Sequence, residues 1–283
     1  MDLVILTVVC VGALGLAALF ALRWGRLEVQ PRPLLSADGP PSKRSALLRY
    51  LRAAAVGLVG GAIAGPLVLG FGGRLAMRIT AGTSDDRVQG VLTEAEETVG
   101  EITLYGTLGL VIFGGLFGGL MGGLLYMLIR RWLRGPAWRA GLVVGLLGLA
   151  VLGRIAALDP DSVDFELLTP RWLAVLLFVV LAPLFGVVLA AVVERLDRSY
   201  PTLAARPGPI AAHAPLLLVL LAPPFALALL LGALVAVFAP RLGSLARNWR
   251  SNAVQRGGQV VLVAVTVLGL VWLSVGVGDI LTA

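Results

Sequence analysis

Arginines and carboxylates beside long apolar stretches are the residues in this sequence best suited to chemistry. Arg74 and Arg78 stand four residues apart, so they share one side of the helix expected there. Arg154 stands near the end of another apolar stretch, and Glu97 and Glu101 precede a third. Guanidinium groups bind carboxylates and phosphates through paired hydrogen bonds. These residues predict either an arginine–carboxylate network that joins helix ends or a site for an anionic solute or lipid headgroup.

Glycines at spacing four form the most regular local pattern. Two apolar stretches carry it, and each set lies on one face of a helix. The sets are Gly57, Gly61 and Gly65 in the first stretch, Gly114, Gly118 and Gly122 in the second, and Gly115, Gly119 and Gly123 one step round from these. Small residues let helix backbones approach closely in lipid. The pattern predicts either a tight pair of these two helices or a face that receives another subunit.

Prolines interrupt two further apolar stretches. Pro183 lies within one of them, and the pair Pro223 and Pro224 lies within the next. Broken helices in transporters offer free backbone groups to substrates near the membrane centre. A kink whose backbone groups bond to neighbouring helices is more common. We therefore expect kinks at these prolines, with a substrate path as the functional alternative.

Several kinds of chemistry are excluded by residues that the sequence lacks. One histidine, His213, and one cysteine, Cys10, cannot build a bis-histidine haem site or an iron–sulfur cluster. No P-loop motif occurs, and the few serines have no histidine beside them. Every acidic residue lies at the end of an apolar stretch or in a loop, which argues against a proton- or sodium-coupled pump. We expect no catalytic residue, no cofactor and no metal, and hence no enzyme.

Apolar stretches of about twenty residues are the elements that must position these side chains. Of the 283 residues, 58% are hydrophobic and 14% are charged, too little charge for the surface of a soluble domain. A helix of about 20 apolar residues crosses a hydrocarbon core of about 30 Å. The predicted fold is an all-α, polytopic transmembrane bundle of about seven spans. These are Leu3–Leu22, Ala53–Met77, Ile102–Ile129, Trp138–Leu158, Trp172–Val193, His213–Phe238 and Gln259–Gly278.

Three regions follow from this division. Residues 1–26 are expected to be an uncleaved transmembrane anchor, because positive charge follows the first apolar stretch and none precedes it. Residues 27–50 are rich in proline, serine and charge and predict a short, disordered cytoplasmic linker. Residues 51–283 are expected to form a six-helix transmembrane domain of three helical hairpins.

The charges between the spans predict the side of the membrane on which each loop lies. Basic residues dominate the loops 23–52, 130–139 and 194–212, whereas acidic residues dominate the loops 85–101 and 159–166. The positive-inside bias places the basic loops in the cytoplasm. Seven spans then put the N-terminus outside and the C-terminus inside a multi-pass protein of the cell membrane. The excess of arginine over lysine indicates a GC-rich bacterial genome.

The loop 239–258 departs from this pattern. It follows six predicted spans, yet it carries four arginines and no acidic residue. Either it is an interfacial helix whose arginines contact headgroups, or the sixth stretch turns back at Pro223 and Pro224. We favour a full span, because the 26 residues His213–Phe238 are too few for two crossings.

The functional expectations follow mainly by exclusion. The net charge of +7 comes from the basic loops that report topology, so no nucleic-acid partner is expected. The first expectation is a non-catalytic accessory, scaffold or complex subunit that packs through its glycine faces against other membrane subunits or a second copy. The alternative is an uncoupled transporter or channel for a small or anionic solute or lipid, with the proline-kinked spans as its path. A lipid-modifying enzyme is the most distant alternative. The expected partner in every case is the lipid bilayer, with anionic headgroups at the outer arginines.

Overall fold

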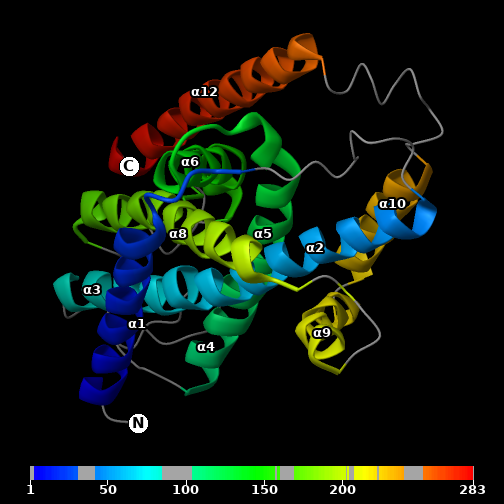
Figure 1. Ribbon diagram of the computed structural model, residues 1–283. Helices are drawn as coiled ribbons and strands as arrows, with labels where there is room; N and C mark the ends of the chain where they lie inside the picture. The colour runs from blue at the N-terminus through cyan, green and yellow to red at the C-terminus, as the bar shows by residue number, and fades with distance from the viewer. Residues whose placement is uncertain are drawn as a thin grey trace.

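Helices make up nearly all of the regular structure in the computed structural model (Figure 1). The structure describes residues 3–30, 42–84, 104–156, 158–159, 169–201, 203, 207–221, 223–238 and 251–282. Within these ranges there is no strand, only an isolated bridge between Glu28 and Pro136. The prediction of an all-α helical bundle is confirmed.

Six helical segments in the described ranges are long and apolar enough to cross a membrane. They are α1 (Leu3–Trp24); α2 (Lys43–Gly65) continued by η1 (Pro66–Gly70) and α3 (Phe71–Thr83); α4 (Leu104–Gly109) continued by η3 (Leu110–Phe117), α5 (Gly118–Ile129) and the 3-10 turn η4 (Arg130–Trp132); α6 (Ala137–Ala156); α8 (Arg171–Ser199); and α12 (Asn252–Thr282). The chain is therefore a polytopic membrane protein. Each of these segments corresponds to one of the seven predicted spans.

Two of these segments change to a wider π-helix in the middle. The first π-helix, η1, begins at Pro66, whose ring nitrogen cannot donate the usual hydrogen bond to the preceding turn. The helix widens there instead, and the backbone N–H of Phe71 bonds to the carbonyl of Pro66. The second π-helix, η3, contacts η1. The two irregular segments therefore lie against each other inside the bundle.

We call one end of the bundle the basic end: it is where α1, α5 and α8 end and where α2, α6 and α12 begin. Hydrogen bonds between distant segments define it. Ala137 of α6 donates to the Leu27 carbonyl at 2.7 Å, and Val29 donates to the Gly135 carbonyl at 3.0 Å. Gly135 has a φ of +88°, which glycine adopts without strain and which lets the chain turn sharply between η4 and α6. The residues just after α1 are thereby fixed to this turn.

The predicted linker is shorter in the structure than in the sequence analysis. The helix α2 begins at Lys43, and the hydroxyl of Ser42 accepts a hydrogen bond from the Ser45 N–H at 3.2 Å as its N-cap. Residues 43–50 therefore belong to a helix rather than to the linker. Residues 31–41, where the disorder was predicted, lie outside the described part of the chain.

The predicted sixth span, His213–Phe238, is not a continuous helix. A 3-10 helix, η5 (Ala214–Leu221), follows the short α9 (Pro207–Ala212), and α10 (Pro223–Phe238) begins at the first of the two prolines. Proline is tolerated in the first turn of a helix but not in its interior. Two adjacent prolines therefore force a new helix to start here.

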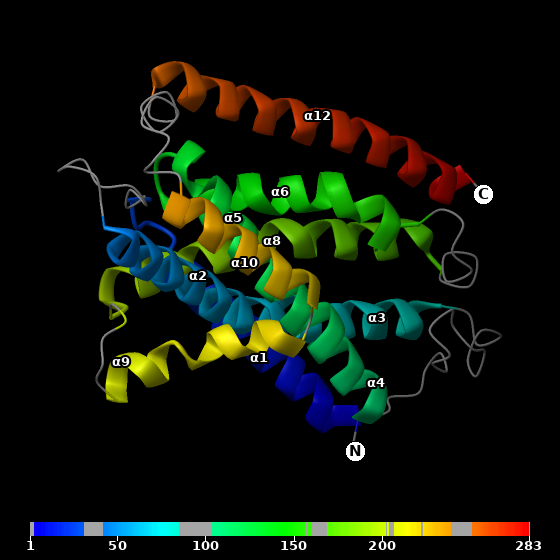
Figure 2. The same cartoon turned by 90° about the vertical axis from the view of Figure 1, so that its right-hand side faces the viewer.

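The broken segment returns to the end of the bundle from which it comes (Figure 2). At its start, the ring of His213 packs edge-on against Tyr200, with ring centroids 5.5 Å apart. In its second half, the Leu229 carbonyl near the middle of α10 accepts a hydrogen bond from Tyr50 at 2.9 Å. Tyr200 and Tyr50 both lie at the basic end, so we call residues 207–238 the returning hairpin. The structure thus corrects the favoured full sixth span in favour of its alternative, a turn at the prolines.

The direction of α12 follows from this hairpin. Gln259, near its start, donates to the Trp132 carbonyl at 3.0 Å, and Arg171 at the start of α8 lies 3.5 Å from the Ile280 carbonyl near its end. The first turn of α1 and the last turn of α12 consequently lie at the same end of the bundle, opposite the basic end (Figure 2). Seven full spans predict opposite ends.

Candidate functional site

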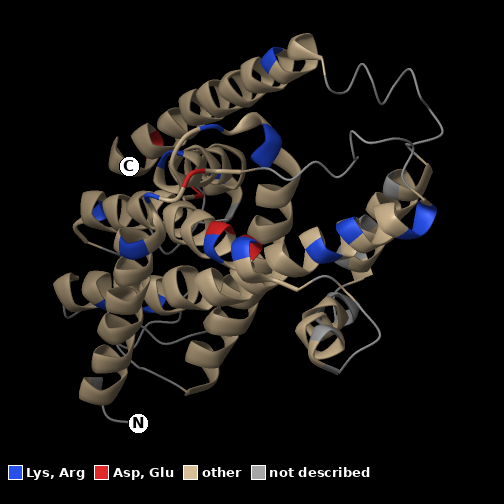
Figure 3. Cartoon of the chain, in the orientation of Figure 1, with Lys and Arg blue, Asp and Glu red and all other residues tan. Residues whose placement is uncertain are grey.

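A buried network of four charged side chains joins α2, α5 and α8 at the basic end. Arg52 comes from α2, Arg130 follows α5, and Glu194 and Asp197 come from α8. These four residues are between 1% and 6% exposed. The two acidic residues stand three apart on α8 and therefore share one face of that helix. Figure 3 shows acidic and basic residues side by side at this end of α8, whereas most helices are free of charge along their middle.

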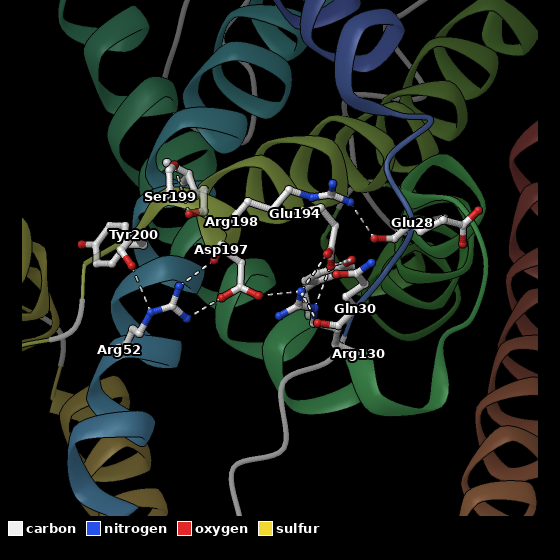
Figure 4. Close-up of polar contacts among 11 residues, drawn as sticks. Glu28, Gln30, Arg52, Arg130, Glu194, Asp197, Arg198, Ser199 and Tyr200 are labelled. Carbon is white, nitrogen blue, oxygen red and sulfur yellow. Dashed lines mark hydrogen bonds and ion pairs between the residues drawn. The ribbon is translucent and has the colours of Figure 1, made fainter. Parts of the chain in front are cut away.

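Arg130 is the centre of this network (Figure 4). Its Nε and Nη2 donate to the two carboxylate oxygens of Glu194 at 2.7 Å each, a two-point bond. Nη2 also donates to Oδ2 of Asp197 at 2.9 Å. The other oxygen of Asp197 accepts from Nη1 of Arg52 at 2.5 Å. Two positive and two negative groups therefore form a neutral chain between three helices.

Backbone carbonyls and a phenol complete the network. Nε and Nη2 of Arg52 donate to the carbonyls of Tyr200 and Asp197 at 3.1 and 2.6 Å. Arg130 reaches the carbonyl of Gln30 at 3.2 Å, and Tyr126 donates its hydroxyl proton to Glu194 at 2.8 Å. A buried charge is stable only when such bonds replace its water. The network thus fixes α2, α5, α8 and the chain after α1 in one arrangement.

A second set of bonds connects the network to the returning hairpin. Tyr200, whose carbonyl holds Arg52, donates its hydroxyl proton to the Ala212 carbonyl at the end of α9. Burial raises the pKa of the Tyr200 phenol, so this donor keeps its proton at neutral pH. The start of the hairpin is therefore held to the end of α8.

The residues of the predicted polar site do not all come together. The guanidinium of Arg154 lies 5.0 Å from the ring centre of Trp272 on α12 and donates to the Trp272 carbonyl at 3.3 Å. Arg74 and Arg78 instead lie on α3, within electrostatic reach of Cys10 on α1. Arg154 and the α3 pair therefore contact different helices. Glu97 and Glu101 lie outside the described residues.

The first predicted glycine face lies against a glycine face of the predicted partner helix. A methyl group on Gly61 would overlap the carbonyl oxygen of Gly119, and one on Gly65 would overlap that of Gly115. A Cβ built on Gly57 would lie 2.7 Å from the carbonyl oxygen of Gly123. The backbones of α2 and the η3–α5 segment therefore touch, and no side chain larger than hydrogen fits between them.

The stripe of span three that meets α2 is Gly115, Gly119 and Gly123 rather than the predicted one. Gly114 faces Leu110 and Gly118 faces Leu69, whereas Gly122 makes room for another helix: a Cβ there would lie 2.6 Å from Cζ of Phe185 on α8. Adjacent stripes have the same spacing, so periodicity alone cannot decide which one meets α2. The stripe that contains Gly122 is turned toward Phe185 of α8, and the stripe that contains Gly119 therefore faces α2.

The predicted kinks differ at the two proline positions. The helix α8 runs through Pro183 without a break from Arg171 to Ser199. Gly145 of α6 lies directly against this point, where a Cβ would be 2.6 Å from the Pro183 Cα. Pro223, by contrast, starts a new helix, with Pro224 as its second residue. Only the second position therefore breaks a span.

The buried network is the functional candidate that the sequence analysis missed. Arg130 is assigned there to a basic loop, and Glu194 and Asp197 are treated as acids at a span end. The available signal was the three-residue spacing of two acids on a helix whose preceding 22 residues, Trp172 to Val193, contain no charge. Acids on one face of such a helix require a cationic partner.

No protein-family model, curated protein or solved structure matches the chain. Within the described ranges, no group of three histidine, cysteine or acidic side chains could hold a metal ion. Functional inference therefore depends on the geometry of the buried groups and of the hairpin.

Proposed function

We propose that the chain is a non-catalytic accessory or scaffold subunit of a membrane assembly. The buried network carries this proposal, because both carboxylate oxygens of Glu194 and both of Asp197 accept hydrogen bonds from arginine. A carboxylate that moves protons or binds ions has to reach its substrate. These two are instead fixed in bonds that hold helices together, which supports a structural role.

The glycine contacts support the same role but change the surface through which a partner would bind. The glycine faces of α2 and α5 are occupied by each other, so they cannot receive a second subunit. The helix α12 packs mainly on α6 and exposes apolar side chains such as Val263, Leu268 and Val271. In the proposed assembly, partner contacts involve such outer helices, and lipid covers the rest.

We also propose an orientation in which the basic end lies in the cytoplasm. The returning hairpin ends at that end, and α12 begins there, so we assign the basic sequence segment that joins them, 239–258, to the cytoplasmic loops. The one exception to the positive-inside bias then disappears. The start of α1 and the end of α12 lie outside in this orientation.

A purification experiment tests the subunit proposal. The full chain with an affinity tag is extracted from its own membranes in mild detergent, and mass spectrometry measures the amount of each co-purifying chain. A second protein in fixed ratio to the tagged chain, or a discrete oligomer of the chain itself, is expected. Recovery as a monomer with no chain in fixed ratio would contradict the proposal.

An uncoupled transporter or channel is the second candidate, and the returning hairpin favours it. Leu216 and Ala226, on either side of its break, pack on Leu58 and Leu120 inside the bundle. Irregular backbone at membrane depth is tolerated only where it is buried in protein or lines a water-filled cavity. In this candidate, the hairpin lines a water-filled path and moves as its gate.

Ion flux across liposomes distinguishes this candidate. The chain carrying Tyr50→Cys and Gly232→Cys, in a Cys10→Ser background, is reconstituted before and after treatment with a short bis-maleimide cross-linker, because the hydroxyl end of Tyr50 lies against Gly232 and the two backbones are therefore one tyrosine side chain apart. Chloride flux that a cross-link stops would favour the transporter. Flux no higher than in protein-free liposomes in both states would count against a chloride path and leave the subunit proposal in place.

A further inference from the structure

Arg74 is a buried arginine whose bidentate hydrogen-bonding edge has no protein partner. The residue is 9% exposed, and its Nε and Nη2 are buried and lack a hydrogen-bond acceptor in the described part of the chain. The buried carboxylates there, Glu194 and Asp197, are bonded to Arg52 and Arg130 at the basic end. Arginine keeps its positive charge inside proteins. The two buried donors of Arg74 therefore require an acceptor.

Arg130 shows what this edge of an arginine binds in the same protein. Its Nε and Nη2 each lie 2.7 Å from one oxygen of Glu194. These two atoms carry parallel N–H bonds, so they match a group with two oxygens on one atom, as in a carboxylate or a phosphate. Arg74 offers the same pair of atoms, and both of them are buried.

The position of Arg74 restricts the source of the acceptor. It stands nine residues before Thr83, the last residue of α3, and so about 14 Å from that end of the helix. An arginine close to a helix end can extend its charge to the membrane surface. Arg74 instead lies near the buried Cys10 of α1, with Arg78 one turn further along α3. Two guanidinium groups on one side of α3 favour an anion with several oxygens over a carboxylate.

We propose that Arg74 binds a phosphate group, with its Nε and Nη2 donating to two phosphate oxygens and Arg78 adding positive charge. The group belongs either to an anionic phospholipid that enters beside α1 and α3 or to free inorganic phosphate. The site lies away from the basic end and does not depend on the subunit role proposed above.

Lipid and phosphate binding by three variants tests this proposal. Native mass spectrometry of the purified full chain measures retention of phosphatidylglycerol and of phosphatidylcholine, and thermal unfolding measures the effect of inorganic phosphate. Arg74→Gln removes the donor edge, and Arg154→Gln is the matched control because Arg154 already has Trp272 as its partner. Arg74→Lys keeps the charge without the two parallel donors.

The lipid source predicts that phosphatidylglycerol binds more tightly than phosphatidylcholine and that Arg74→Gln weakens it about tenfold. The free-phosphate source predicts a rise in unfolding temperature with phosphate that Arg74→Gln abolishes. Arg154→Gln should behave as the unmodified chain in both tests. Equal binding of both probes by Arg74→Gln and the unmodified chain would overturn the proposal. If Arg74→Gln does not fold, Arg74→Lys decides: weakened binding supports the two-point bond, and unchanged binding overturns it.

Discussion

Arg130 links separate segments of the chain at the basic end. It bonds to Glu194, Asp197 and the carbonyl of Gln30, and thus to α8 and to the chain after α1. The net contribution of a buried ion pair is modest, because desolvation offsets attraction. The loss of one member is costly, however, since it leaves the other charges buried without a partner. The network therefore contributes mainly to the uniqueness of the helix arrangement.

We expect Arg130→Ala to destabilise the folded protein by about 3–5 kcal/mol, because Glu194 would keep a buried charge with no guanidinium beside it. Arg134→Ala is the control: it removes an exposed arginine at the same end, and its effect should stay within about 0.5 kcal/mol. The free energy of unfolding in mixed micelles measures both. Equal effects of the two substitutions would show that the network does not hold the helices.

At the scale of the helices, contact between glycine backbones sets the distance between α2 and α5. Gly61 and Gly119 face each other there, and a Cβ on either one would overlap the other's carbonyl oxygen. Gly12 on α1 provides a contrast, since a Cβ there would meet no atom within 4 Å. The same residue type therefore serves close packing in one span and a lipid-facing surface in another.

Gly61→Ala should destabilise the protein by about 1–3 kcal/mol, because the added methyl group pushes α2 from α5. Gly12→Ala should be neutral or stabilising by up to about 1 kcal/mol, since alanine favours the helix and finds open space. Thermal unfolding of the two variants in the same detergent measures the difference. If both lower the midpoint equally, the two backbones are not in contact.

The course of the hairpin could not be predicted from the sequence in the way that the other apolar helices could. The other six spans are local features, since an apolar stretch of sufficient length forms a helix whatever surrounds it. The stretch from His213 to Phe238 meets the same criterion, yet Pro223 and Pro224 prevent a single helix, and Tyr50 binds the middle of the helix that follows them. The pairing of Arg130 with Glu194 joins residues 64 positions apart, and no local pattern contains it.

At the scale of the whole molecule, the returning hairpin sets the direction in which α12 runs along the bundle. In the described residues, six segments are long and apolar enough to cross a membrane, and with the hairpin between the fifth and the sixth, the start of α1 and the end of α12 lie at one end of the bundle. A full crossing by residues 213–238 would place them on opposite faces. The direction of α12 therefore distinguishes the two topologies: it runs antiparallel to α8 after a returning hairpin and would run parallel to α8 after a full crossing.

Labelling of single cysteines with a membrane-impermeant maleimide tests this topology. In a Cys10→Ser background, we expect Thr282→Cys to react in intact cells, and Arg134→Cys and Ser251→Cys to react only after the membrane is opened. The reason is that Ser251, which precedes α12, and Arg134 both lie at the basic end. Reaction of Ser251→Cys and Arg134→Cys from opposite faces would restore the full sixth span.

The π-helix η1 gives the second span a rotational offset. A π-helical turn holds more residues than an α-helical one, so the faces of α2 and α3 are not continuous with each other. Restoring an α-helix between Pro66 and Gly70 without removing a residue would rotate α3 by about 100° relative to α2. Gly57, Gly61 and Gly65 would still face α5, whereas Arg74 would turn away from Cys10. A proline eight residues before Arg74 thus sets the direction in which that arginine points.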